Sequence, residues 1–589
     1  MPYIPAVAKR ANTRSEDRSA SPHDALPGVV EAHLAALEGR PGRSGRATLR
    51  KEQGSHYTPP ALVGWILDRA MDGRDVPAAA LDPACGVGNF LVAVAERMVA
   101  RGVGTAETLR ERVFGIDIDA TAVELCRARL ASLLPADTPA SERDAVVRAL
   151  GANIVVGDAL ARSIEDLTGR AAFELIVGNP PFLNQLEVAT SASRERAARV
   201  RERSRGAVTG YADLSAAFLF EACGHLAPGG TVGFVMPQSF LAAADARSMR
   251  GWLAANTQVR DLWTADERLF EDAGVRVCAV VAEAGPRFTF ELDGGRVERA
   301  FGAAFAPLAP VARARLSAEE PWAALFSDAR GVPTLSIPAT ATIGAIAMVT
   351  ADFRDQFYGL RGAIVDARDA DEARFPRLVS TRHVDLARCA WGEVPARILF
   401  ERHAAPRADR ATLERDASMA AWIRARLVPK VLVATQTRVM EAVVDEEGAW
   451  LPVVPLLTAT LREDSAADLW MLAAAIGSPV VTAEASRVSY GTALSAGAIK
   501  LSATQLLAMP LPRDEGGWRE SAQLFRAASQ ARDATARERL LRDFAEVSCR
   551  AHALGGAAEA EVLRFWSGRR GGGQAKGPRT PFGARGPGG

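Results

Sequence analysis

The sequence predicts an α/β protein: a doubly wound, largely parallel sheet followed by a second domain of mixed α and β type. Between about residues 54 and 287, short apolar runs alternate with helical patterns. Nearly every residue in these runs is apolar, which is typical of parallel strands covered on both faces. The pattern changes after about residue 330, and the chain of 589 residues is long enough for roughly three or four domains.

Six apolar runs in the first part predict strands, and three longer periodic stretches between them predict helices. The predicted strands are 78–82, 113–119, 153–158, 173–179, 231–237 and 277–285, and the predicted helices are 91–100, 120–134 and 212–226. In the second part we predict strands at 430–438 and 453–462, a helix at 466–477, and one or two amphipathic helices within 519–566.

These patterns suggest domain boundaries. The predicted segments are a disordered basic stretch at 1–50, the first α/β domain at 51–290, a connector at 291–340, the mixed domain at 341–515, helices at 516–568 and a disordered Gly/Arg tail at 569–589.

Charge and composition exclude several classes of protein. The net charge of +1 excludes a globally basic nucleic-acid binder, although residues 40–51 and 569–589 are locally basic. The N-terminal stretch lacks the apolar segment of a signal peptide, and no apolar run reaches about 18 residues, so we expect a soluble cytoplasmic protein without a membrane partner. None of the six cysteines forms C-x-x-C, so neither a metal site nor a disulfide framework is expected.

Acidic residues end three consecutive predicted strands. The first strand leads into LDPACGVGNFL (81–91), where Asp82 precedes Gly86 and Gly88 and a helix follows. Asp117 ends the second strand and Asp158 the third. Because open α/β sheets bind ligands at the carboxyl ends of their strands, these acids and the glycine turn predict a ligand site.

The sequence GNPPF (178–182) directly follows the fourth strand. Two prolines make this turn stiff and remove two backbone donors. The side-chain oxygen of Asn179 and the carbonyl of Pro180 can then both accept hydrogen bonds, which suits an amino group with two N–H donors. Phe182 offers a flat apolar face on which a base can stack.

In this order, the motifs resemble those of the gamma-class N6-adenine DNA methyltransferases, which use S-adenosyl-L-methionine. The likeness is strong over about 54–287 and weaker over 350–515. It implies a Rossmann-like methyltransferase fold with a C-terminal target-recognition domain. It assigns cofactor contacts to Tyr57, Thr58, Pro59, Asp82, Pro83, Ala84, Gly86, Asp117 and Asp158, and catalysis to Asn179, Pro180, Pro181 and Phe182.

The resemblance further implies a modification enzyme of a restriction-modification or phage-defence system, acting on double-stranded DNA by flipping out an adenine. A separate nuclease or defence subunit is a possible partner. The sequence departs from the family where related enzymes often place a second aromatic residue: it has Glu283 and Ala284 there, with Phe288 nearby but out of register.

We expect the second domain to recognise the target DNA sequence. We take as candidate DNA contacts the polar and basic residues Arg382, His383, Lys430, Gln436, Thr437, Arg438 and Lys500. The arginine-rich stretch 194–205 follows the predicted catalytic turn and is either a solvated helix face or a contact to the DNA backbone.

Other functions stay open at this point. RNA and protein-glutamine methyltransferases also use N-P-P-Y/F, because an amide or a guanine amine presents the same two donors. A DNA-binding subunit that has lost catalysis is the non-enzyme alternative. The five lysines do not form the E-x-K pattern of the common restriction nuclease core, which argues against nuclease activity in this chain.

Overall fold

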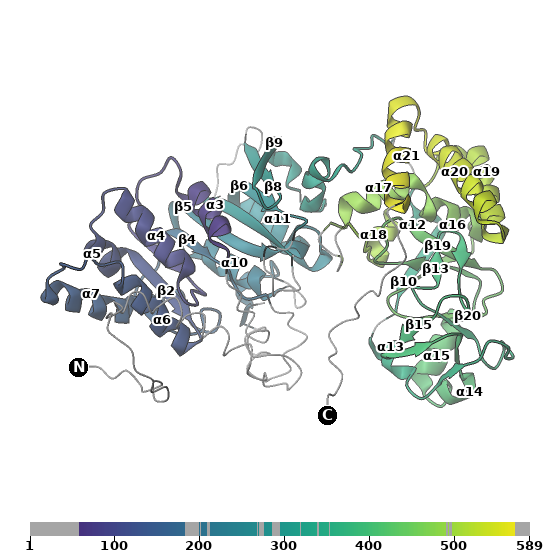
Figure 1. Ribbon diagram of the computed structural model, residues 1–589, viewed down its shortest axis with the longest axis horizontal. Coiled ribbons are helices and arrows are strands. Elements are labelled where there is room, and N and C mark those ends of the chain that lie inside the picture. Colours follow the sequence, from purple (N-terminus) through teal and green to yellow (C-terminus); the bar gives the residue numbers. More distant parts are fainter. Residues whose placement is uncertain are drawn as a thin grey trace, which may run out of the picture. The chain divides into compact units, whose positions relative to one another are not determined.

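The computed structural model describes residues 58–182, 199–200, 202–208, 213–267, 269, 276–285, 295–317, 320–337, 341–352, 354–490, 493 and 497–571 (Figure 1). The predictions for residues 1–50, Tyr57, Phe288, half of 194–205 and residues 572–589 lie outside these ranges. The chain divides into two compact units. Within the described ranges, the first unit comprises 58–203, 213–235 and 281–285, and the second comprises the remainder.

The main sheet has nine strands in the order β3-β2-β1-β4-β5-β7-β6-β8-β9. Strand β1 pairs in parallel with β2 and β4, β2 with β3, and β4 with β5. The predicted parallel sheet is therefore confirmed. Its strands are β1 (Ala80–Asp82), β2 (Val113–Asp117), β3 (Ile154–Val156), β4 (Phe173–Gly178), β5 (Leu226–Pro237), β6 (Thr257–Thr264), β7 (Val277–Ala284), β8 (Arg296–Phe301) and β9 (Ala306–Ala312).

Helices connect the strands of the first unit, and their ends follow local side-chain chemistry. Asp119 caps the N-terminus of one helix by accepting from the backbone N–H groups of Thr121 and Ala122, and Asp213 caps another through Ser215. The helices of this part are α3 (Pro60–Met71), α4 (Asn89–Ala100), α5 (Thr105–Glu107), α6 (Ala120–Ala131), α7 (Ala140–Asn153), α8 (Ile164–Thr168) and α10 (Leu214–Gly224).

The sequence analysis missed three strands of the main sheet. Strands β8 and β9 lie within the segment predicted as a connector, and β6 was not predicted either. The residues of β8, RVERAF, alternate exposed and buried positions at its start, so this strand lacks the continuous apolar run used to recognise the others. Helix α11 (Arg247–Asn256) precedes β6.

The C-terminal half contains two four-stranded sheets, ordered β10-β21-β18-β19 and β11-β17-β12-β20. The strand predicted at 430–438 ends at Ala434, because Gln436 has a left-handed backbone. The strands are β10 (Ala347–Ala351), β11 (Ile364–Asp366), β12 (Arg377–Val379), β17 (Pro406–Ala408), β18 (Lys430–Ala434), β19 (Glu441–Asp445), β20 (Trp450–Pro452) and β21 (Leu457–Leu461); short hairpins are β13 (Val384–Asp385) with β14 (Arg388–Cys389) and β15 (Ala396–Ile398) with β16 (Glu401–His403).

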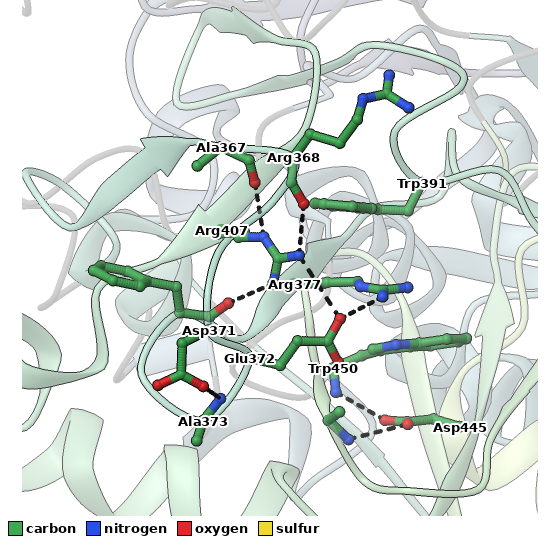
Figure 2. Close-up of polar contacts among 12 residues, drawn as sticks. Ala367, Arg368, Asp371, Glu372, Ala373, Arg377, Trp391, Arg407, Asp445 and Trp450 are labelled. Carbon is green, nitrogen blue, oxygen red and sulfur yellow. Dashed lines mark hydrogen bonds and ion pairs between the residues drawn. The ribbon is translucent and has the colours of Figure 1, made fainter.

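Arg407 holds the second of these sheets together (Figure 2). Its guanidinium donates to the carbonyls of Ala367, Arg368 and Phe375 at 2.7–2.9 Å, and Glu372 lies 3.7 Å away. The ring of Trp391 lies 4.7 Å from this guanidinium and 4.9 Å from that of Arg377. A planar five-donor group can satisfy several buried carbonyls of an irregular loop at once, which a lysine cannot do.

A buried ion pair joins the first and last residues of the β18–β19 hairpin. The ammonium group of Lys430 and the carboxylate of Asp445 are in contact, and the side chains have exposed fractions of 0% and 2%. Asp445 also accepts from the backbone N–H of Ala449 and from that of Trp450, which is labelled in Figure 2. These extra bonds orient the carboxylate and compensate part of the cost of burying it.

Three helices, rather than the one or two predicted, end the described chain: α19 (Glu515–Gln530), α20 (Ala534–Ala551) and α21 (Gly556–Gly571). The breaks coincide with Asp533, which caps α20, and with Gly556 at a positive φ. Helix α21 includes Arg569 and Arg570, so the prediction that the disordered tail begins at residue 569 is wrong for these residues. The other helices of this half are α12 (Ile343–Ile346), α13 (Arg354–Gly359), α14 (Arg410–Leu413), α15 (Ala417–Arg426), α16 (Leu469–Gly477), α17 (Pro479–Val488) and α18 (Ala503–Leu507).

Among the described residues, no single helix is long and apolar enough to cross a membrane. Only α16 and α17 taken together reach that length and apolarity, and they are bent by 56°.

Breaking the buried ion pair should destabilise the second unit. We expect Lys430→Met to lower the free energy of unfolding by about 3 kcal/mol, because it leaves a carboxylate buried without its cation. Urea denaturation measures this. Lys500→Ala is the matched control, since Lys500 is exposed and its removal should change stability by less than about 0.5 kcal/mol. Equal stability of the two variants would contradict the role given to the pair.

Candidate functional site

The predicted site residues of the first unit follow four neighbouring strands. Strands β3, β2, β1 and β4 lie side by side and run parallel, so their carboxyl ends meet at one edge of the sheet. Asp82 ends β1, Asp117 ends β2, Asp158 follows β3 and Asn179 follows β4. The structure thus places these four residues at a common edge, where sheets of this kind bind ligands.

The turn after β1 takes a shape that requires glycine. Gly86 and Gly88 have φ values of +52° and +86°, in the left-handed region. A Cβ added to Gly88 would lie 2.6 Å from the Sγ atom of Cys126, whereas one added to Gly86 would meet no heavy atom within 4 Å. The space beside Gly86 is therefore open, and Gly88 leads directly into helix α4, whose first N–H groups lack partners within the helix.

Asp117 ties this glycine turn to the next strand. One carboxylate oxygen accepts from the backbone N–H of Gly86 at 2.8 Å, and the other accepts from that of Asp119 at 2.9 Å. Burial raises the pKa of Asp117, while these hydrogen bonds lower it. The neighbouring side chain of Ile118 has an exposed fraction of 57%, which places an apolar surface beside a polar one at the strand end.

Asp82 lies buried between the glycine turn and the end of β4. It has an exposed fraction of 1%, and its carboxylate accepts from the backbone N–H of Ala84 at 3.0 Å. A Cβ added to Gly178 would lie 2.6 Å from one of its oxygens, so the carboxylate packs directly against that glycine. Burial raises the pKa of Asp82 to about 8, an effect that the Ala84 hydrogen bond opposes and nearby Asp117 reinforces.

Asn179 is held by Thr58. The Nδ2 atom of Asn179 donates to the hydroxyl of Thr58 at 3.0 Å, and Thr58 itself is 3% exposed. Residue 58 lies just before helix α3, which begins with Pro60 at its first turn. The Nδ2 and Oδ1 atoms of an amide point in different directions from the same carbon. Because Nδ2 is bonded to Thr58, this contact sets the direction in which the Oδ1 acceptor of Asn179 points.

The remaining residues of the turn complete its stiff geometry. Pro180 is buried, and Pro181 and Phe182 are partly exposed. Asp158 accepts from the backbone N–H groups of Leu160 and Ala161, which closes a tight turn after β3. Glu283 forms a salt bridge with Arg74, at the position where related enzymes often have a second aromatic residue.

Arg129 is a residue that the sequence analysis missed. From helix α6 its guanidinium donates to the carbonyl of Val87 at 2.7 Å and to the side-chain oxygen of Asn89 at 2.8 Å. Both acceptors belong to the glycine turn, which Arg129 therefore supports from outside. A single arginine 40 residues from the motif carries no sequence pattern that would identify this role.

Two of the candidate DNA contacts are corrected by the structure. His383 and Lys430 have exposed fractions of 0%, and a side chain without exposed surface cannot contact DNA. Burial lowers the pKa of His383 to about 4, and Lys430 forms the ion pair with Asp445. Lys430 lies in β18 and His383 in the turn just before β13, and a sequence pattern does not distinguish an inward from an outward polar side chain at such positions.

The other candidates are more accessible. Arg382 is partly exposed and donates to the carbonyl of Pro395 at 3.1 Å. Gln436 is partly exposed, and Arg438 and Lys500 are exposed, whereas Thr437 between them is buried. Thr437 and Ile499 form an isolated antiparallel bridge, so the structure brings Gln436, Arg438 and Lys500 together from two distant segments.

The protonation of Asp82 should make stability depend on pH. Because its pKa is raised to about 8 in the folded protein, the folded state holds a proton that the unfolded state has released between about pH 4 and pH 8. Stability should therefore fall as the pH rises through this window, by at most about 1.4 kcal/mol per pH unit. Urea unfolding at pH 5, 6, 7 and 8 measures the slope, and Asp82→Asn should flatten it. If the stability of the wild type and that of Asp82→Asn change equally with pH, the raised pKa of Asp82 is refuted.

Comparison with known proteins identifies this region. Residues 46–286 match the model of the N-6 DNA Methylase family. The chain is 26% identical over 233 residues to the Type II methyltransferase M.BanIII of Aneurinibacillus aneurinilyticus, which covers 38% of this chain and 37% of that protein. It is 25% identical over 226 residues to the Type I restriction enzyme MjaIX methylase subunit of Methanocaldococcus jannaschii, covering 38% and 36%. The chain thus matches little more than a third of the length of each relative.

A solved structure resembles the fold over most of the chain. The Type IIL restriction-modification enzyme MmeI, solved in complex with DNA, superposes with a TM-score of 0.51 at 12% sequence identity, covering 94% of this chain and 78% of that one. At this identity the likeness concerns the fold alone, and it agrees with the α/β architecture expected from the sequence. The motifs lie at the expected strand ends, and the segment that contains them, residues 46–286, is the part of the chain that matches the N-6 DNA Methylase family.

Proposed function

We propose that this protein is a site-specific DNA methyltransferase that transfers the methyl group of S-adenosyl-L-methionine to N6 of a flipped-out adenine. The observation that carries the proposal is the bond from Asn179 to Thr58, made at the sheet edge beside the buried Asp82 and the glycine turn. It links the N-P-P-F turn to the segment preceding α3 and fixes the orientation of the amide that must receive the substrate amine.

The chemistry explains why an amide stands at this position. The amine of adenine is a poor nucleophile, because its lone pair is delocalised into the ring. Asn179 cannot act as a base, but its oxygen and the carbonyl of Pro180 can accept the two amino hydrogens. Such bonds favour a pyramidal nitrogen whose lone pair points at the methyl donor, so they strengthen toward the transition state.

The open glycine turn fits the proposed cofactor. S-adenosyl-L-methionine supplies an electrophilic methyl group when bound. Asp117, at the end of β2, would accept from the ribose hydroxyls and Asp158 from the adenine amine. Tyr57, Thr58 and Pro59 would flank the methionine part, while Asp82, Pro83, Ala84 and Gly86 would form the main cofactor loop. Space beside Gly86 and the accessible N-terminus of α4 support this assignment.

A duplex hides the adenine amine, so the base must leave the stack before it reacts. Phe182, which is partly exposed, would stack on the flipped ring. The C-terminal half would read the target sequence. We assign the protein to the cytoplasm, with double-stranded DNA as substrate and a separate restriction or defence subunit as a possible partner.

The alternatives have less support. RNA and protein-glutamine methyltransferases with an N-P-P-Y/F turn usually lack a large recognition domain. This chain, in contrast, has about 300 residues after residue 286. A catalytically decayed subunit would have no need of Asn179 and its supporting bond to Thr58.

The proposal is tested by expressing the chain in a host that lacks adenine methylation and mapping modified bases across the genome. We expect N6-methyladenine at one recurring short sequence. Asn179→Ala should abolish the modification but bind the cofactor as the wild type does, because the amide acts on the amine and not on the cofactor. An unmodified genome, with protein that binds S-adenosyl-L-methionine, would instead favour an RNA or protein substrate or a missing subunit.

Thr58 should act by positioning Asn179. Thr58→Val keeps the shape but removes the acceptor, so we expect kcat to fall about 10-fold, the cost of one misplaced hydrogen bond. Thr58→Ser retains a hydroxyl and should restore most of the rate. Steady-state kinetics with separate kcat and KM values tests whether Thr58 positions Asn179. A change confined to the KM for the cofactor would mean that Thr58 serves cofactor binding alone.

A further inference from the structure

A short bridge on the second unit brings together residues that are far apart in sequence. Thr437, in the loop between β18 and β19, pairs antiparallel with Ile499. The backbone N–H of Gln436 donates to the carbonyl of Ile499 at 2.8 Å, and that of Ile499 donates to the carbonyl of Thr437 at 2.7 Å. Two consecutive residues of one segment thus face a single residue of the other, which is the pattern of a β-bulge.

Gln436 occupies a backbone conformation that favours glycine. Its φ is +69°, and the first position of a bulge with this geometry is usually glycine because a Cβ is unfavourable there. Non-glycine residues held in such conformations concentrate at functional sites, and bulges serve to redirect a side chain. The glutamine at this strained position is partly exposed.

The bridge separates buried from exposed side chains. Thr437 and Ile499 have exposed fractions of 1% and 2%, whereas their neighbours Arg438 and Lys500 are exposed. The hydroxyl of Thr437 donates to the carbonyl of Val439 at 2.6 Å, which anchors the loop from inside. An amide and two cations therefore surround a rigid pair of backbone segments.

Arg569 of helix α21 fixes the two segments to each other. Its guanidinium donates to the carbonyl of Arg438 at 2.5 Å and to that of Gly497. Burial, together with the nearby guanidinium groups of Arg330 and Arg438, lowers the pKa of Arg569 to about 10, while Asp266 opposes this effect. Among the described residues whose charges act on Arg569, two are cations and one is an acid, which favours a polyanion as ligand.

We propose that this surface, formed by Gln436, Arg438 and Lys500 on the Thr437–Ile499 bridge, contacts duplex DNA, with Gln436 reading a base edge and the two cations binding backbone phosphates. A glutamine amide offers a donor and an acceptor, which match N7 and N6 of adenine in the major groove. Arg438 and Lys500 would place the duplex without selecting its sequence. The inference rests on the proposed function, since it names the residues that select the methylated sequence.

The first test compares methylation by the wild type and by Gln436→Gly across the genome of a host without adenine methylation. Glycine suits the left-handed backbone, so the variant should unfold at a temperature equal to or above that of the wild type. We expect the recognised sequence to become degenerate at one base pair, with discrimination there reduced about 10-fold or more. A folded variant that methylates the same sequence with undiminished selectivity would overturn base reading by Gln436.

The second test measures binding to a random-sequence duplex over a range of salt concentrations. Arg438→Ala and Lys500→Ala should each weaken binding and reduce the slope of log affinity against log salt by about 0.9, the value for one lost phosphate contact. Gln436→Gly should leave this affinity unchanged. Arg519→Ala is the matched control, because Arg519 is an exposed arginine paired with Glu515 on α19. Unchanged slopes for both bridge variants would overturn the phosphate contacts.

The two tests separate this inference from the proposed function. If the wild type leaves the genome unmodified, the proposed methylation is wrong in that host, but the salt dependence still decides whether the bridge binds DNA. If the wild type methylates one sequence and the bridge variants behave as the wild type in both tests, the enzyme function stands and the inference fails.

Discussion

The contact between Asp82 and Gly178 is the constraint on which the candidate site of the first unit depends. It joins the end of β1 to the end of β4 so closely that a single methyl group on residue 178 would collide with the carboxylate. The glycine turn that begins at Asp82 and the N-P-P-F turn that begins after Gly178 are thereby held side by side. The proposed methyl transfer needs two reactants aligned at contact distance, and this packing would help to supply that alignment before either reactant binds.

Near this contact, three side chains support the glycine turn. Asp117 accepts from the N–H of Gly86, Arg129 donates to the carbonyl of Val87 and the side chain of Asn89, and Cys126 packs against Gly88. Thr58 supports the other turn through Asn179. The supporting residues come from the end of β2, from helix α6 and from the segment before α3, so several elements of the first unit preorganise the site. Rigid support of this kind places donors and acceptors within the narrow tolerance that catalysis requires.

The C-terminal half uses buried charge for a different purpose. Arg407 satisfies three carbonyls of an irregular loop, and Lys430 with Asp445 closes the β18–β19 hairpin from inside. The loop at the other end of the same hairpin carries Gln436 and Arg438, so the hairpin has a charged, buried base and a polar, accessible tip. Such a division between a fixed support and an exposed loop is common where loops carry recognition.

The sequence by itself determined the parallel sheet, the order of the motifs, the likeness to N6-adenine DNA methyltransferases and the residues at the strand ends, because apolar runs, glycine turns and N-P-P-F depend on local chemistry. It did not reveal β6, β8, β9 or Arg129, and it wrongly offered His383 and Lys430 as surface contacts. Only the tertiary structure decided which polar side chains point inward and which distant segments meet. The bridge of Thr437 to Ile499 spans more than 60 residues of sequence, and a pairing at that separation leaves no local pattern, because it is set by packing rather than by neighbours along the chain.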